Sequence, residues 1–236
     1  MTLEETIRRI RPVDQKAKED AKAHWDGLGK PLGSLGRLED VIVQIAGIQR
    51  TPQIHIEKKA LVIMCADNGV VEEGVTQCGQ EVTASVAENF LDEKSCVAIM
   101  CKRAGAGIYP VDIGMAVDTP RIEKRKVAYG TKNMTKEPAM TRAQAVATIE
   151  AGIAKAQELK NLGYELLATG EMGIGNTTTS SAVASVLLDE SVETMTGRGA
   201  GLDSAGLRRK ICAIKTAIAK NKPNADDPVD VLSKVG

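Results

Sequence analysis

Apolar residues recur at helical spacing through the first fifty positions of the chain. Leu3, Ile7 and Ile10 form a short stripe that Pro12 ends, and a second helical segment runs over 13–25. After a loop rich in turn-forming residues, apolar positions recur three and four residues apart, as on one face of a helix. These positions are Leu38, Val41, Ile42, Ile45 and Ile48. We therefore predict a small helical subdomain at this end of the chain.

From Lys59 onward, short apolar runs alternate with longer helical stretches. The run over 60–65 is apolar throughout, which is typical of a strand buried on both faces of a sheet. Two further strands are predicted over 108–113 and 164–168, and a weaker one over 127–129. The helices predicted after these strands span 81–90, 95–104, 141–162, 177–188 and 202–219.

This alternation of strands and helices indicates a parallel sheet covered by helices. We predict an α/β fold with a parallel Rossmann-like sheet, helices on both faces and a small N-terminal helical subdomain. Residues 1–50 form that subdomain, and residues 51–236 form an α/β nucleotide-binding domain whose sheet is incomplete at the C-terminal end. Ligands of such sheets bind beyond the carboxyl ends of the strands. The loops predicted there are 67–78, 112–115, 171–179 and 197–201.

Composition excludes several classes of function. The 31 basic and 31 acidic residues cancel, so no electrostatic surface favours nucleic acid or a membrane. Five aromatic residues are too few for base-stacking platforms. The five cysteines form no CxxC pair and the two histidines lie apart from them, so we expect no metal site and no cofactor. Without a leader-like or membrane-length apolar segment, we expect a cytoplasmic protein.

A glycine- and threonine-rich turn over 170–179 carries the first chemical signal. It lies between a predicted strand and a predicted helix, where backbone N–H groups and hydroxyls converge at a helix N-terminus. Such a turn can hold a phosphate. An ordinary strand–helix connection would have the same composition, so this turn alone leaves both interpretations open.

Four segments together extend this signal. They are Lys30–Glu39, Cys65–Val75, Gly170–Thr178, and Gly197–Asp203 followed by Lys210. In this order and spacing they closely resemble the nicotinate-nucleotide–dimethylbenzimidazole phosphoribosyltransferase family, from about residue 2 to the end of the chain.

The resemblance implies a glycosyltransferase of cobalamin lower-ligand synthesis. It would move phosphoribose from nicotinate mononucleotide to 5,6-dimethylbenzimidazole or a related base, giving α-ribazole 5′-phosphate and nicotinate. It also implies a homodimer. The nicotinate leaves from a cationic pyridinium without an acid, so one carboxylate base is sufficient, and the remaining task is orientation. A non-catalytic nucleotide-binding partner subunit of the same family is the alternative.

The resemblance also implies roles for residues of this chain. Gly173, Asn176 and Thr177 would contact phosphate and ribose, and Lys210 would lie near the nucleotide. Glu171 is the tentative catalytic carboxylate, with anchoring of its loop as the alternative.

Further positions complete the expected substrate site. Gly199 and Gly201 would let the backbone approach the substrate. Asp67, like Asp112, would bind ligand or cap a loop. Cys78 and Val86 stand where the family has polar residues beside the aromatic base. A different benzimidazole, a purine or a phenol therefore stays open as the acceptor, and Cys78 is expected to face it without acting as a nucleophile.

The family's principal general base lies in a C-terminal Gly-Glu-Gly segment that this chain does not contain. The resemblance therefore leads us to expect a truncated form, a partial gene product or a short paralogue. By itself, the 236-residue chain is expected to be inactive.

Overall fold

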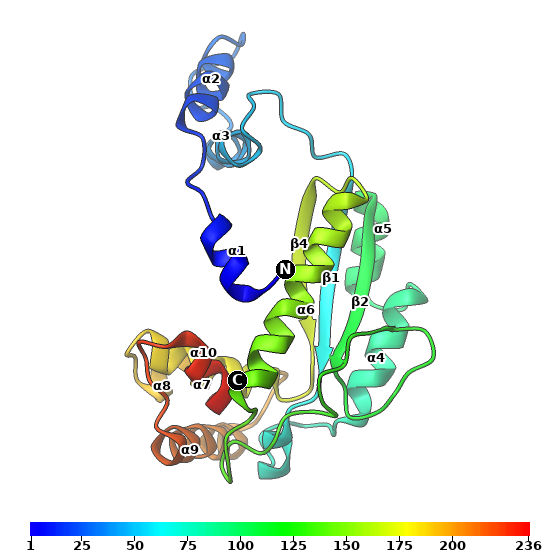
Figure 1. Ribbon diagram of the computed structural model, residues 1–236, viewed down its shortest axis with the longest axis vertical. Helices are drawn as coiled ribbons and strands as arrows, with labels where there is room; N and C mark the ends of the chain where they lie inside the picture. The colour runs from blue at the N-terminus through cyan, green and yellow to red at the C-terminus, as the bar shows by residue number, and fades with distance from the viewer. The chain divides into compact units, whose positions relative to one another are not determined.

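A computed structural model describes residues 1–236, and the chain divides into two compact units between Lys58 and Lys59. The unit formed by residues 2–58 contains α1 (Leu3–Arg9), α2 (Gln15–Asp26) and α3 (Arg37–Gln49) (Figure 1). The expected helical subdomain is present. The boundary predicted after residue 50 coincides with the end of α3, and the following segment to Lys58 belongs to the same unit.

The second unit is built on a four-stranded parallel sheet in the order β3-β2-β1-β4. Its strands are β1 (Lys59–Ala66), β2 (Ala106–Gly114), β3 (Glu123–Lys124) and β4 (Leu166–Met172). The predicted parallel α/β sheet is therefore confirmed.

Two strand predictions were wrong in position. The weak strand expected over 127–129 is replaced by β3, because the Val127 and Gly130 N–H groups donate to the Ile113 and Gly114 carbonyls and fold that segment over the end of β2. The strand expected over 164–168 lies later, as β4. Its end was misjudged because Glu171 is polar, yet this residue still pairs with Met64 of β1.

Side chains of β1 alternate between the two faces of the sheet, as a period of two requires. Ala60 and Val62 pack with Leu159 of α6 (Arg142–Asn161), whereas Leu61, Ile63 and Cys65 face the opposite helices. Those helices are α4 (Glu81–Leu91) and α5 (Cys96–Ala104). Figure 1 shows α6 on one face and α4 and α5 on the other, which confirms helices on both faces.

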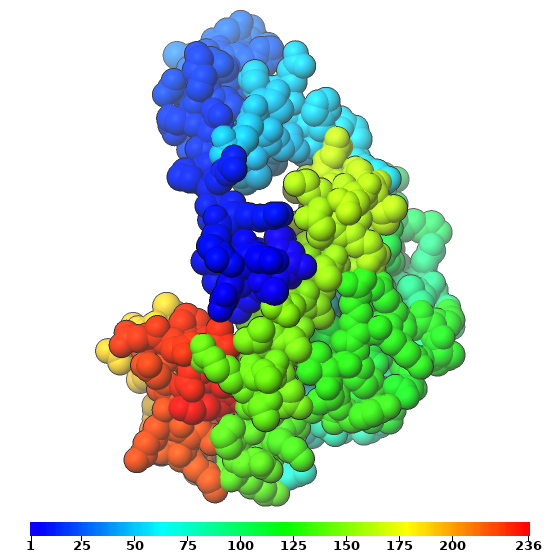
Figure 2. All heavy atoms as spheres, in the orientation of Figure 1, coloured from blue at the N-terminus to red at the C-terminus, as the bar shows by residue number.

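The C-terminal helices form a second layer with its own apolar core. They are α7 (Asn176–Leu187), α8 (Val192–Met195), α9 (Ser204–Asn221) and α10 (Pro228–Val235), and α7 contacts both α9 and α10. Figure 2 shows α9 and α10 gathered in the orange and red part of the surface. No helix of the structure is both long and apolar enough to cross a membrane.

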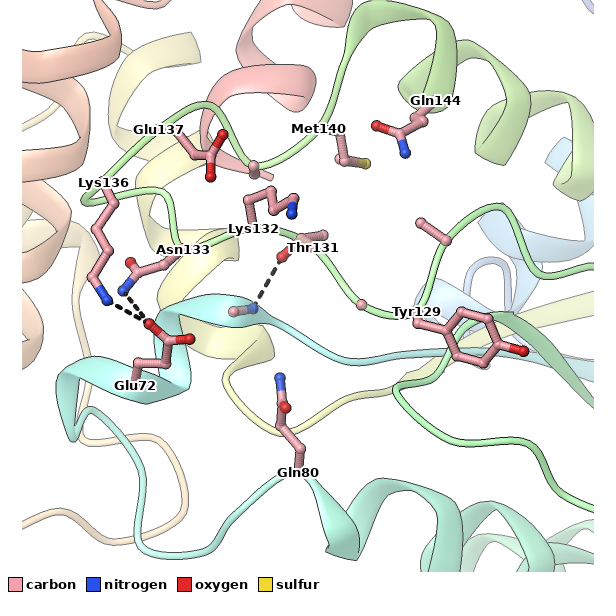
Figure 3. A pocket seen from close by; sticks show the side chains of 14 residues that line it. Glu72, Gln80, Tyr129, Thr131, Lys132, Asn133, Lys136, Glu137, Met140 and Gln144 are labelled. Carbon is pink, nitrogen blue, oxygen red and sulfur yellow. Dashed lines mark hydrogen bonds and ion pairs between the residues drawn. The ribbon is translucent and has the colours of Figure 1, made fainter.

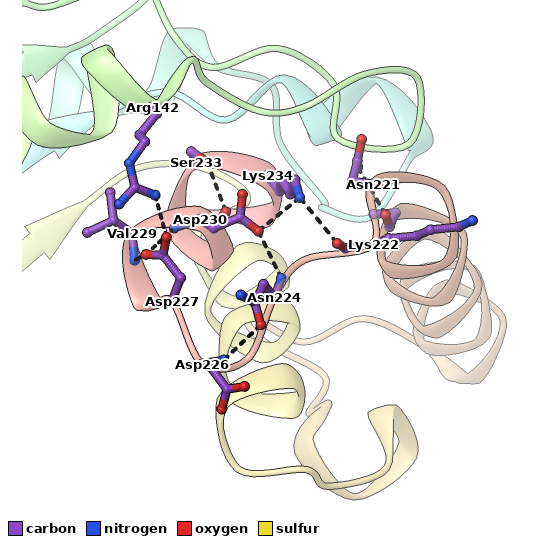
Figure 4. Close-up of polar contacts among 11 residues, drawn as sticks. Arg142, Asn221, Lys222, Asn224, Asp226, Asp227, Val229, Asp230, Ser233 and Lys234 are labelled. Atoms are coloured by element: carbon purple, nitrogen blue, oxygen red, sulfur yellow. Dashed lines mark hydrogen bonds and ion pairs between the residues drawn. The ribbon is translucent and has the colours of Figure 1, made fainter.

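The sequence analysis missed three short elements, the 3₁₀ helix η1 (Gly69–Glu73), α8 and α10. The start of α10 depends on polar contacts (Figure 4). Asp227 accepts hydrogen bonds from the Val229 and Asp230 N–H groups and pairs with Arg142 at 2.6 Å. Pro228 occupies the first turn, where its missing N–H costs nothing. The Asp227 cap and Pro228 are sequence signals for the start of a helix. The helix itself has only eight residues, too few for a clear apolar periodicity.

Candidate functional site

Three parallel strands bring polar residues to one edge of the sheet. Asp67 directly follows β1, Asp112 lies near the end of β2, and Glu171 lies near the end of β4. The strands are adjacent, and Cys65 of β1 is paired with Asp112. The loops expected at the carboxyl edge therefore start from neighbouring strand ends.

Asp67 and Asp112 both hold the loop that follows β2. Asp112 accepts hydrogen bonds from the Gly114 and Met115 N–H groups at 3.1 and 2.8 Å, and Lys126 lies 3.2 Å from its other oxygen. Asp67 accepts the Ala116 N–H at 2.8 Å. Both carboxylates are buried. Of the two roles foreseen for them, these contacts favour capping of the loop.

Burial raises the pKa of Asp67, and the nearby Asp112 carboxylate adds to this effect, while hydrogen bonds from Ala116 and Thr83 and the charge of Lys126 oppose it. A carboxyl group with a raised folded-state pKa stabilises the fold below its unfolded pKa, and that contribution is lost as pH rises through the folded value.

We expect Asp67→Asn to raise the free energy of unfolding near neutral pH by about 1 kcal/mol, because it removes a buried charge and keeps an acceptor for Ala116. Urea titrations at pH 4 and pH 7 measure this. A gain as large at pH 4 as at pH 7 would contradict it.

The turn between β4 and α7 is pressed against the end of β1. A Cβ on Gly173 would lie 2.0 Å from the Ala66 carbonyl oxygen, and Gly175 has a φ of 93° just before the helix. The amide of Asn68 donates to the Ile174 carbonyl at 3.0 Å. Gly173 is buried and packs on the sheet, and it does not line the cavity described below.

A continuous series of contacts connects the end of β4 with α9. The Asn176 side-chain amide donates to both oxygens of Glu171 at 2.8 Å, and its carbonyl oxygen accepts the Thr177 N–H at 2.8 Å. The Thr177 hydroxyl in turn accepts a hydrogen bond from the Lys210 ammonium at 2.6 Å. The Glu171 carboxylate and the Lys210 ammonium, 39 positions apart in sequence, are thereby connected through the side chains of Asn176 and Thr177.

Lys210 is a buried cation without an anionic partner. It is 1 % exposed, and its ammonium donates only to the Thr177 hydroxyl and, at 3.2 Å, to the Gly197 carbonyl. Burial lowers the pKa of Lys210. A buried ammonium is normally paired with a charge, so this one is poised to gain from an anionic ligand.

A cavity of about 60 Å³ opens beside this ammonium. That volume is roughly twice the ~30 Å³ that one water molecule takes in the liquid, so the cavity suits a small group and not a whole nucleotide. Gly199 has a φ of 58°, and a Cβ there would lie 2.8 Å from the Thr177 hydroxyl and 3.4 Å from the Lys210 ammonium. The side chains or backbone that line the cavity belong to residues 75–78, 174–177, 198–200, 202 and 210.

The structure gathers five of the expected residues around this cavity: Cys78, Asn176, Thr177, Gly199 and Lys210. Gln77 also lines it and was missed, since nothing in its surrounding sequence sets it apart.

Of the other expected residues, Val86 and Gly201 do not line the cavity. Val86 packs against the apolar core between α4 and the sheet. The Gly201 carbonyl accepts a hydrogen bond from the Gln77 side-chain amide at 2.7 Å. Arg198 lines the cavity, but its guanidinium donates to the Leu202 carbonyl and the Ser204 hydroxyl.

A larger cavity, of about 630 Å³, lies between η1, the loop over 128–140 and the start of α6 (Figure 3). Two of the charged side chains that line it form an ion pair: Lys136 lies 2.7 Å from Glu72. The Asn133 amide donates a hydrogen bond to the same carboxylate. None of the expected site residues lines it. Because the smaller cavity contains the buried, unpaired ammonium, it is the better candidate site.

The sequence of this chain is similar to those of known phosphoribosyltransferases. A family model described as phosphoribosyltransferase matches residues 10–236. The chain is 49% identical to the nicotinate-nucleotide–dimethylbenzimidazole phosphoribosyltransferase of Clostridium tetani, over 99% of this chain and 65% of that protein. For the protein of the same name from Acetivibrio thermocellus, the identity is 50% over 98% of this chain and 67% of that one. The chain thus spans about two thirds of the length of these relatives.

A solved structure shows the same similarity in three dimensions. The crystal structure of a nicotinate-nucleotide–dimethylbenzimidazole phosphoribosyltransferase from Thermus thermophilus superposes with a TM-score of 0.87 at 35% identity. The match covers 94% of this chain and 67% of that structure.

Proposed function

This chain belongs to the phosphoribosyltransferase family, and from that premise we propose that it serves the transfer of phosphoribose from nicotinate mononucleotide to 5,6-dimethylbenzimidazole or a related base. The products would be α-ribazole 5′-phosphate and nicotinate. In this proposal the chain supplies the nucleotide site of an enzyme whose place in cobalamin lower-ligand synthesis the family resemblance implies. Its relatives are named nicotinate-nucleotide–dimethylbenzimidazole phosphoribosyltransferases.

The observation that carries the proposal is the buried Lys210 ammonium beside a cavity of about 60 Å³. Only neutral oxygens contact this cation, so a phosphate would supply the missing counter-charge through charge-assisted hydrogen bonds. The first N–H groups of α7 contribute less than the sequence suggested, because Asn176 and the Gly175 carbonyl already accept those of Thr177 and Thr178.

The remaining groups suit the sugar and the acceptor. Glu171 presents its carboxylate at the strand end, and an ionised carboxylate is an acceptor that fits ribose hydroxyls. We propose that the phosphate binds at the Lys210 end of the Glu171–Lys210 series of contacts and the ribose at the Glu171 end. Cys78, exposed at the rim of the cavity, would face the aromatic acceptor.

Gly199→Ala tests the phosphate site. The added methyl group would occupy the space between Thr177 and Lys210, so we expect nicotinate mononucleotide to bind at least ~10-fold more weakly, a loss of about 1.4 kcal/mol. Gly197→Ala is the matched control, because its Cβ would meet nothing within 4 Å and its affinity should stay close to wild type. Titration calorimetry compares the three chains. Equal binding by the Gly199→Ala variant, or no binding by wild type, would reject the proposal.

We further propose a cytoplasmic homodimer, which the family resemblance supports. Size-exclusion chromatography with light scattering gives the oligomeric state directly, and a monomer at micromolar concentration would contradict this part of the proposal.

A further inference from the structure

Neighbouring residues already engage the amide nitrogen and the oxygen of the Asn176 side chain. Both Glu171 oxygens accept its amide N–H groups, and its carbonyl oxygen accepts the Thr177 N–H. The sequence had suggested that this residue touches phosphate or ribose. In the structure it instead joins the last part of β4 to the first turn of α7.

We infer that Asn176 is a positioning residue, which holds the Glu171 carboxylate at a fixed place relative to the Thr177–Lys210 phosphate site without touching the nucleotide. The inference rests on the function proposed above. Glu171 lies on the exposed end of a strand, where a free glutamate side chain would sample several rotamers. Two hydrogen bonds from one amide select a single orientation, because both carboxylate oxygens must face the same nitrogen.

The arrangement also fixes the distance between the two ends of the site. Asn176 is the first residue of α7 and Thr177 the second, and Thr177 contacts Lys210 directly. The Asn176 side chain contacts the Glu171 carboxylate and the Thr177 N–H, whereas Lys210 contacts the Thr177 hydroxyl. A change in the Asn176 side chain therefore acts most directly on the carboxylate. Misplacement of a binding group by about 1 Å can cost on the order of 100-fold in rate.

Asn176→Asp isolates this contact. Aspartate has nearly the same shape and keeps an oxygen for the Thr177 N–H, but it places a carboxylate against Glu171. We expect a lower melting temperature and a dissociation constant for nicotinate mononucleotide raised by ~10-fold or more, the range for hydrogen bonds to charged groups. Asn161→Asp on α6 is the matched control, because it adds the same charge at an exposed residue that contacts Gln157.

The double variant Glu171→Gln/Asn176→Asp completes the test. It restores an amide–carboxylate pair with the two groups exchanged and has the net charge of wild type. We expect its melting temperature to recover relative to Asn176→Asp, while its affinity for nicotinate mononucleotide stays within about threefold of Glu171→Gln alone, because coupled residues are not additive.

Each other outcome overturns the inference. Wild-type affinity in the double variant would mean that the pair is only structural. A second full loss of affinity on top of Glu171→Gln would mean that Asn176 contacts the nucleotide itself. If the wild-type chain binds no nicotinate mononucleotide, the proposed function is wrong. The melting temperatures still test the Asn176–Glu171 contact separately. A double variant whose melting temperature does not recover would reject that contact.

Discussion

Replacing Lys210 by methionine should weaken the binding of nicotinate mononucleotide by ~10- to 100-fold and at the same time stabilise the fold. The loss of binding follows from the loss of the one buried cation of the candidate site, since a hydrogen bond to a charged partner contributes about 1.5–3 kcal/mol. The gain in stability follows because methionine has a similar length and no charge to desolvate. The two oxygens that lose a donor belong to Thr177 and Gly197, which are exposed and can bond to water.

The pH dependence gives this prediction a second readout. Burial lowers the pKa of Lys210 below its ordinary value of 10.5. Between the folded and the unfolded pKa, the unfolded chain binds more protons, so wild-type stability rises with pH in that alkaline range. The methionine variant lacks this contribution, and its advantage should shrink as pH approaches 10.5.

Calorimetry with nicotinate mononucleotide and urea unfolding at pH 7 and at pH 10 measure both effects. A variant that binds as wild type does would exclude Lys210 from the phosphate site. A variant less stable than wild type at pH 7 would show that the ammonium supports the fold, contrary to its lack of an ionic partner.

Replacing Gly173 by alanine should unfold or severely destabilise the sheet unit. The added Cβ would lie 2.0 Å from the Ala66 carbonyl oxygen, a backbone atom of the last β1 residue, which pairs with Gly114 of β2. No rotamer can relieve this contact, so we expect a loss at or beyond the ~3 kcal/mol upper end of usual overpacking costs. Thermal unfolding followed by circular dichroism measures the effect.

Gly152→Ala, within α6, is the matched control for that substitution. Its nearest neighbour would be a methionine methyl group at 3.8 Å, an ordinary contact. Alanine inside a helix is favoured over glycine by about 0.5–1 kcal/mol, so this variant should be slightly more stable than wild type. Similar melting temperatures for the two variants would show that the turn after β4 can move away from β1.

Much of the fold could be predicted because its signals are local. The long helix was expected over 141–162, and Thr141 caps it with a capping box that includes Gln144. The apolar run at 60–65 was expected to be buried on both faces, and it lies between α6 and the α4–α5 pair. Prediction failed where polar residues continue a strand, as at Glu171, because their ladder bonds depend on β1 and not on their neighbours in sequence.

The same division applies to the candidate site. The residue types of the site could be identified from the sequence alone: a glycine-rich turn after a strand, a threonine and asparagine at a helix start, and a lysine on a later helix. These are properties of adjacent residues, and a family resemblance could rest on them. Three further facts became apparent only in three dimensions: Lys210 is buried without a counter-charge, Asn176 is engaged by Glu171 and Thr177, and Gly173 packs on β1. Those facts depend on contacts such as Thr177–Lys210, 33 residues apart, and Gln77–Gly201, 124 apart. Residues so distant meet only when the sheet and the helical layer pack together, and burial and hydrogen-bond partners are set at that step.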